Sequence, residues 1–218
     1  MLAFTEHTGK IAVLNRANID TDQIIPKDFL KSIKRTGYGE HLFEDWRYRD
    51  DGGPNPDFEL NQPRFQGASI LIVGNNFGCG SSREHAVWAV VQYGFHAIIA
   101  PRKKLGNTVI PGFADIFRVN SAKNGLLTVE LKEDQVSELI RLVSAHEGLK
   151  ATIDLPAQKI ILQFTNGHQA EGEREFLFDI DPGTKRHFLE GLDEIAQTLK
   201  YEKEIKKFEK THSVQMDK

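Results

Sequence analysis

The chain has 218 residues, of which 39 % are hydrophobic and 27 % charged, and a formal net charge of −3. This is the composition of an ordinary globular protein with one well-buried core. No basic stripe is interleaved with aromatic residues, so the sequence predicts no nucleic-acid partner. The apolar runs are far shorter than the roughly 18 residues of a membrane-spanning helix, so no membrane association is expected.

The number of cysteines excludes two kinds of cysteine chemistry in this chain. Cys79 is the one cysteine of the sequence, so an intrachain disulfide is impossible. A single thiol also cannot supply the several thiolates that hold an iron–sulfur cluster. The first residues have no basic start followed by an apolar run, and therefore do not resemble a secretory signal. We expect a soluble, cytoplasmic protein in a reducing compartment, with no cofactor of its own.

The amino-terminal part of the chain predicts short elements joined by polar loops. Residues 10–14 form an apolar run typical of a strand, and residues 15–22 are too rich in Asn and Asp for regular structure. Pro26 favours the start of a helix over residues 26–34, because proline at the first helical position loses no needed hydrogen bond. The proline- and glycine-rich residues 50–67 predict an extended surface loop.

The middle of the chain predicts a βαβ unit. Residues 69–73 are a continuous apolar run suited to a strand buried on both faces. A glycine-rich turn leads to a helix over residues 82–93, and Gly94 ends that helix. Residues 95–100 predict a second buried strand. A strand, helix and strand at this spacing imply a parallel pair with a right-handed crossover.

The carboxyl-terminal part predicts two helices and three strands. The helices are expected at residues 130–147 and 184–199, and the strands at 151–155, 159–164 and 176–180, the first two as an antiparallel pair. The densely charged residues 200–218 predict a solvated or frayed tail. The chain is therefore expected to be an α/β protein with a mixed sheet and flanking helices, in which residues 1–199 form one domain.

The segment between the first strand and the helix of the βαβ unit is the candidate site. Residues 78–85 read Gly-Cys-Gly-Ser-Ser-Arg-Glu-His. Glycines allow the backbone close to a ligand, the helix start attracts anions, and Arg83 offers a planar fork for a carboxylate. The spacing does not fit a P-loop, a dinucleotide loop or a nucleophile elbow. One alternative remains, because Ser81 and Glu84 also match a capping box that only starts the helix.

The same segment closely resembles the signature of the small subunits of 3-isopropylmalate dehydratase, and its Gly-Ser-Ser-Arg-Glu-His core is shared with the swivel domain of aconitases. The resemblance extends over nearly the whole chain. It rests on residues 18–26, 35–37, 42–47, 76–86, 88–89, 113–117, 124–127, 189–193 and 198–199. Several motifs in the right order make a chance likeness implausible.

This resemblance implies a swivelling β/β/α fold and a hydro-lyase that is active only as a hetero-oligomer. A large subunit would carry a 4Fe-4S cluster, and the substrate would be a small dicarboxylate, 2-isopropylmalate or 3-isopropylmalate, in leucine biosynthesis. By similarity, Ser81 is the base that removes the carbon-bound proton. Ser82 and Arg83 hold a substrate carboxylate, Asp22 lines the same cleft, and Arg35 is a weaker substrate contact.

The sequence leaves two alternatives open and departs from the family pattern at a few places, most seriously in one segment. The same chemistry on another malate derivative, such as citramalate or homoaconitate, is one alternative, and a non-catalytic anion-binding module is the other. The most serious departure is an apparent insertion at residues 102–111, directly after a predicted strand. We expect a surface loop there, close enough to the site to affect docking of the large subunit.

Overall fold

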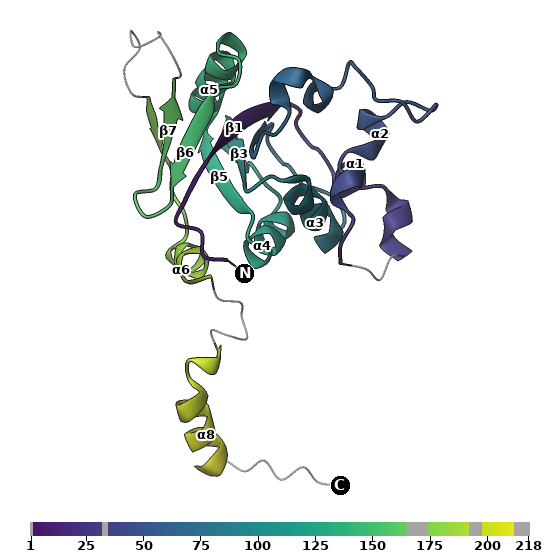
Figure 1. The fold of residues 1–218 in the computed structure, drawn as a ribbon. Coiled ribbons are helices and arrows are strands. Elements are labelled where there is room, and N and C mark those ends of the chain that lie inside the picture. The colour runs from purple at the N-terminus through teal and green to yellow at the C-terminus, as the bar shows by residue number, and fades with distance from the viewer. Residues whose placement is uncertain (1, 32–34, 165–173, 192–197, 212–218) are drawn as a thin grey trace.

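A computed structural model describes residues 2–31, 35–164, 174–191 and 198–211 (Figure 1). One mixed sheet forms the centre, with strands in the order β4-β3-β2-β1-β6-β7-β8 and with β5 also paired to β3. Helices cover the sheet, and the predicted α/β class is confirmed. Among the described residues, no helix has the length and apolar character needed to cross a membrane.

The parallel half of the sheet contains the predicted βαβ unit. β1 (Glu6–Leu14), β2 (Ile70–Val73), β3 (Ala97–Leu105) and β5 (Leu127–Lys132) run parallel, with β2 between β1 and β3. Every residue of β2 is buried, because both of its faces are covered. Successive side chains of β2 point to opposite faces of the sheet, so Ile70 and Ile72 belong to one core and Leu71 and Val73 to the other.

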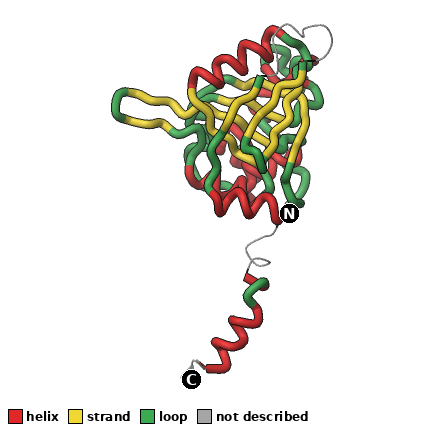
Figure 2. Tube along the Cα trace, turned by 90° about the vertical axis from the view of Figure 1, so that its left-hand side faces the viewer, coloured by secondary structure: helices red, strands yellow, loops and turns green. Residues whose placement is uncertain are grey.

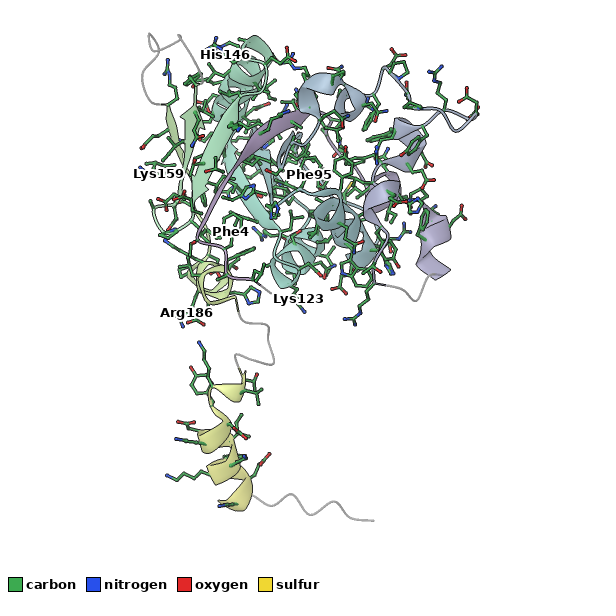
Figure 3. All side chains as sticks on the ribbon, in the orientation of Figure 1. Phe4, Phe95, Lys123, His146, Lys159 and Arg186 are labelled. Atoms are coloured by element: carbon green, nitrogen blue, oxygen red, sulfur yellow. The ribbon has the colours of Figure 1, made fainter. Side chains whose placement is uncertain are left out.

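The antiparallel half completes the sheet. The first part of β1 pairs with β6 (Lys150–Asp154), which continues to β7 (Lys159–Gln163) and β8 (Glu175–Leu177). This confirms the predicted antiparallel pair. Phe4, labelled in Figure 3, lies near the start of the chain. Its N–H donates to the Phe188 carbonyl at 2.8 Å, which ties the start of the chain to this side of the molecule.

The helices form two layers over the sheet. The core on one face includes residues of α3, and the core on the other face includes residues of α5. The α-helices are α1 (Thr21–Ile24), α2 (Glu44–Arg47), α3 (Glu84–Tyr93), α4 (Asp115–Lys123), α5 (Glu133–Ala145), α6 (Pro182–Glu190) and α8 (Glu202–Thr211). Short 3-10 helices are η1 (Lys27–Lys31), η2 (Gly39–His41), η3 (Glu59–Asn61) and η4 (Pro63–Phe65).

Several predicted boundaries near the amino terminus were wrong. The helix expected at residues 26–34 is the 3-10 helix Lys27–Lys31, and residues 32–34 lie outside the described part. The loop expected at residues 15–22 ends earlier, because Asp20 caps α1 through a hydrogen bond from Gln23 N–H. The extended loop at residues 50–67 holds the 3-10 turns η3 and η4.

Corrections in the second half of the chain concern helix ends. The helix expected from residue 130 begins at Glu133, because residues 130–132 belong to β5. The helix expected at residues 184–199 begins at Pro182 and ends at Glu190, where Gly191 takes a left-handed conformation with φ of 62°. Residues 192–197, also part of that prediction, lie outside the described residues.

Two segments project from the body. The apparent insertion is a β-hairpin made by the end of β3 and by β4 (Thr108–Ile110), and not the expected loop; it extends to the left in Figure 2. The charged tail contains the exposed helix α8, which points away from the sheet (Figure 1).

Candidate functional site

The candidate site lies at the carboxyl edge of the parallel strands. Residues 74–83 leave the end of β2 and lead into α3, which is where open α/β sheets place their ligands. The side chains of Ser81 and Ser82 are exposed at this edge, while Phe77 and Gly78 below them are buried. The two hydroxyl groups are therefore accessible to a ligand, while the residues beneath them are packed into the core.

One side of this loop is held by the segment that contains α1. Gly78 N–H donates to the Ile19 carbonyl at 2.8 Å, and Thr21 N–H donates to the Cys79 carbonyl at 2.9 Å. The Thr21 hydroxyl donates to the Ser81 carbonyl at 2.9 Å. Thr21 is a buried polar residue, 2 % exposed, so this bond is shielded from water. The backbone of Ser81 is therefore fixed from beneath.

The other side of the loop is held by the strand-like residues after β4. Asn76 N–H donates to the Pro111 carbonyl and Phe77 N–H to the Gly112 carbonyl, each at 2.9 Å. Gly78 has a φ of 72°, and a Cβ there would lie 2.3 Å from the Phe117 ring. Only glycine fits this position. The glycines of the motif thus allow a tight, doubly anchored loop.

Ser81 does not start the helix. α3 begins at Glu84 with Arg83 at the N-cap, and no side chain caps it. The Glu84 carboxylate instead accepts a hydrogen bond of 3.0 Å from the Asn124 amide, so it does not reach back to Ser81. The capping-box alternative was therefore wrong. Within the described residues, no hydrogen bond occupies the hydroxyl group of Ser81 or Ser82.

Arg83 and Asp22 meet directly. Their side chains form an ion pair, and the Arg83 side chain is only 11 % exposed. Lys27 lies 3.4 Å from the other carboxylate oxygen of Asp22. Asp22 lies in α1 and Arg83 just before α3, so two segments distant in the sequence meet here. The structure thus brings together four of the five predicted site residues, since Asp22 lies against the consecutive residues 81–83. The positive end of the α3 backbone dipole lies at the same place.

Arg35 lies apart from this group. Its guanidinium is 5.9 Å from the ring centre of Trp88, in the second turn of α3, and its carbonyl accepts a hydrogen bond from the Gln92 amide. The side chain is exposed on the flank of the helix. Sequence reasoning also missed Thr21 as a support for Ser81. Its neighbours Asp20 and Gln23 form a capping box, which was the available signal for an ordered segment.

The environments of Cys79 and His85 favour structural roles for both residues. Burial, followed by the negative charge of Asp20, raises the pKa of the Cys79 thiol, so the reactive thiolate is disfavoured. His85 packs edge-on against Tyr38 and Trp88 at ring distances of 5.3 and 4.8 Å. One protonated thiol does not make a donor set for an iron–sulfur cluster. The residues of this chain therefore do not fit that cofactor.

Comparison with protein families agrees with this architecture. Residues 1–134 match the aconitase C-terminal domain, which is more than half of the chain. Fold and site together define a protein of the aconitase superfamily.

Comparison with individual proteins is more specific. A relative from Desulforapulum autotrophicum, named 3-isopropylmalate dehydratase small subunit, is 52 % identical over 217 residues, covering 100 % of this chain and 99 % of the relative. A relative of the same name from Bacillus subtilis is 52 % identical over 207 residues, or 95 % and 94 % of the two chains. The chain belongs to the family of 3-isopropylmalate dehydratase small subunits, hydro-lyase components of leucine biosynthesis.

A solved structure supports the fold. A 3-isopropylmalate dehydratase from Methanocaldococcus jannaschii superposes with a TM-score of 0.59 at 24 % identity, covering 93 % of this chain and 98 % of the other. At this identity the likeness concerns the fold alone. The roles of the individual site residues stay predictions.

Proposed function

We propose that this chain, joined to a large subunit, interconverts 2-isopropylmalate and 3-isopropylmalate by removing and re-adding water. The observation that carries the proposal is the display of Ser81, Ser82 and Arg83 at the carboxyl edge of the sheet, with the Ser81 hydroxyl left unused by the helix. A non-catalytic anion-binding module would need the helix start and Arg83, but no anchored, uncommitted hydroxyl group.

Ser81 is proposed as the base that takes the proton from the substrate carbon. A serine hydroxyl has a high pKa, so its alkoxide needs stabilisation by groups that are already in place. The amino end of α3 supplies oriented N–H dipoles, and Arg83 supplies a positive charge two residues away. The Thr21 bond to the Ser81 carbonyl fixes the backbone from which the hydroxyl projects.

Ser82 and Arg83 are proposed to bind a substrate carboxylate. The guanidinium of Arg83 is suited to a bidentate contact, because its fork geometry matches a carboxylate. Asp22 holds the guanidinium in position before substrate arrives, so it acts as a positioning residue in the cleft. Arg35, beside Trp88, is proposed as an outer contact for the substrate.

The remaining components belong to the partner. The chain does not offer the ligands of a 4Fe-4S cluster, and we propose that the large subunit holds it. The isolated chain should therefore be folded, colourless and inactive. We also place the pair in the cytoplasm, since a free thiol such as Cys79 is usual in reducing compartments.

The test is Ser81→Ala in the assembled enzyme. Because Ser81 is not a helix cap, the variant should keep the wild-type melting temperature. Loss of a positioned base should lower the turnover number by about 10²- to 10⁴-fold. Ser144→Ala is a matched control, since Ser144 is exposed on α5 and its hydroxyl donates to the Ile140 carbonyl one turn earlier in the same helix. Turnover by Ser81→Ala within a few-fold of wild type, at equal large-subunit occupancy, would refute the base assignment.

Substrate identity is tested in the same assay. Hydration of isopropylmaleate should have the highest kcat/KM among the candidate substrates. A higher kcat/KM with the citramalate or homoaconitate series would keep the hydro-lyase chemistry and change the substrate. No turnover of any of them by the assembled pair would favour the binding module.

A further inference from the structure

Residues 103–110 form a regular β-hairpin with a defined turn. Lys103 pairs with Ile110 and Lys104 with Val109, and the loop between the strands is Gly106-Asn107. Gly106 has a φ of 59°, as required at the first loop position of a type II′ turn. This turn matches the twist of the two strands. The segment therefore forms a defined arm that projects beyond the sheet (Figure 2).

The tip of this arm exposes apolar side chains on both faces. Leu105 is 64 % exposed and Val109 is 53 % exposed. Cross-strand partners share a face, so Val109 lies on the face of Lys104, and Leu105 lies on the opposite face with Thr108. A two-stranded hairpin alone in water is marginally stable. Because apolar side chains lie on both faces of the hairpin, both faces are buried only if the hairpin inserts between two surfaces of another molecule.

The root of the arm is tied to the candidate site. Arg102 forms an ion pair with Glu130 at 2.7 Å, and the second oxygen of Glu130 accepts a hydrogen bond of 3.0 Å from Gly112 N–H. Immediately beyond β4, the Pro111 and Gly112 carbonyls accept the hydrogen bonds from Asn76 and Phe77 in the site loop. The segment at the root of the arm is therefore hydrogen-bonded through its backbone to the loop that carries Ser81.

We propose that this hairpin is a docking arm that inserts into the large subunit beside the active site. The inference rests on the proposed function, in which the large subunit closes over Ser81, Ser82 and Arg83. A partner that covers this edge meets the arm as well, because the two are joined through their backbones. The complementary surface is an apolar slot with acidic groups near the exposed Lys104.

A second copy of this chain fits the arm less well. Pairing of two β4 edges would join only the three residues Thr108–Ile110 of each chain. Such a contact buries far less than the roughly 1,200 Å² of a stable interface. The large subunit is therefore the occupant that the observations favour.

The test compares Leu105→Asp/Val109→Asp with Leu177→Asp, a control on β8 whose side chain is 68 % exposed. Both should keep the melting temperature of the free chain, since the altered side chains are in water. Titration of the cognate large subunit should show the Kd raised about tenfold or more by the arm variant, and unchanged by the control. At saturating arm variant, kcat for isopropylmalate should stay within a few-fold of wild type.

Two results would overturn the docking arm. One is an unchanged Kd for the arm variant, and the other is a wild-type dimer of the isolated chain, seen by sedimentation, that the arm variant abolishes. The proposed function is judged separately, by turnover of the wild-type pair. An active wild-type pair with an unaffected arm variant would refute the arm alone. Inactivity of the wild-type pair would refute the proposed function.

Discussion

The Thr21 hydroxyl donates a hydrogen bond of 2.9 Å to the backbone carbonyl of Ser81, and so joins α1 to the loop before α3. Thr21 is almost fully buried and lies outside the motif that identifies the site. Its contact is with the backbone of the proposed base and not with any ligand. We therefore propose that Thr21 is a positioning residue, with an effect on catalysis that is separable from its effect on folding.

Thr21→Val tests this relationship. Valine keeps the shape of threonine and removes the donor, so the free energy of unfolding should fall by about 1 kcal/mol. The turnover number should fall by about tenfold or more, with a smaller change in KM, because a slight misplacement of Ser81 affects the reaction more than binding. Steady-state kinetics of the assembled enzyme and urea unfolding of the free chain give the two quantities.

Thr152→Val is the matched control for that variant. Thr152 is also a buried threonine, and its hydroxyl is bonded to Thr8 and Gln163, each at 2.7 Å, on the antiparallel part of the sheet. It should cost similar or greater stability and leave the turnover number unchanged. Equal kinetic effects of the two substitutions would show that Thr21 contributes only to folding.

Asp22→Asn separates two roles for the carboxylate beside Arg83. If Asp22 positions the guanidinium, removing its charge leaves Arg83 less ordered, and KM for the dicarboxylate should rise by about tenfold or more, the value of a charged hydrogen bond. If Asp22 only competes with the substrate for Arg83, KM should fall. The direction of the change in KM, measured in the assembled enzyme, decides between positioning and competition.

The βαβ unit was predictable because its signals are local and strong. Residues 69–73 are apolar without interruption and Gly94 stands where a helix must end, and both assignments are confirmed by β2 and the end of α3. The site loop was predictable from its glycines and Arg83. The contact between Arg83 and Asp22 was only implied by family resemblance, because no local pattern connects two segments so far apart.

Other elements were missed for identifiable reasons. α4 exposes Ile116 and Val119 and buries Ser121, so its apolar residues do not mark the buried face. β5 has the alternating burial of a strand. The apolar residues that follow it have helical spacing, and the predicted helix was therefore started too early, at residue 130. The Gly106-Asn107 turn is a recognised hairpin signal. It was overlooked because residues 102–111 were interpreted as an inserted surface loop.

Truncation after residue 199 tests the proposed division into a domain and a tail. Every residue of 201–210 is exposed, and Lys200 is tied to Glu190 by a surface ion pair of 2.7 Å. Such a pair contributes about 0.2 to 1 kcal/mol. The melting temperature of residues 1–199 should therefore lie within about 4 °C of that of the full chain.

A longer truncation that also removes α6 should, by comparison with the truncation after residue 199, destabilise the protein strongly. Phe188 in α6 is 1 % exposed and packs edge-on against Phe4 at a ring distance of 6.1 Å. Loss of this buried aromatic side chain should cost about 3 to 5 kcal/mol. A large destabilisation from the short truncation alone would place α8 within the cooperative unit, contrary to the proposal.

His7 lies near the start of β1, at the amino edge of the parallel strands and opposite the site. Its ring lies 4.4 Å from that of His96, and its Nε2 is 2.8 Å from the Ser69 hydroxyl. Burial, followed by electrostatic repulsion from His96, lowers the pKa of His7 below its ordinary 6.5. The folded state therefore disfavours the protonated ring, whereas the unfolded chain takes up the proton at about 6.5.

It follows that the unfolded state binds more protons than the folded state just below pH 6.5, and stability falls there as the pH is lowered. The contribution of His7 is fully present above pH 6.5 and is lost as the pH falls from 6.5 through the lower folded pKa. Urea unfolding at pH 7.5 and 5.5 should show this loss, and His7→Gln should reduce it. His96→Gln should also reduce it, because without the repulsion the pKa of His7 moves back toward 6.5. An NMR titration of the wild-type chain that places the His7 pKa at or above 6.5 would contradict the prediction.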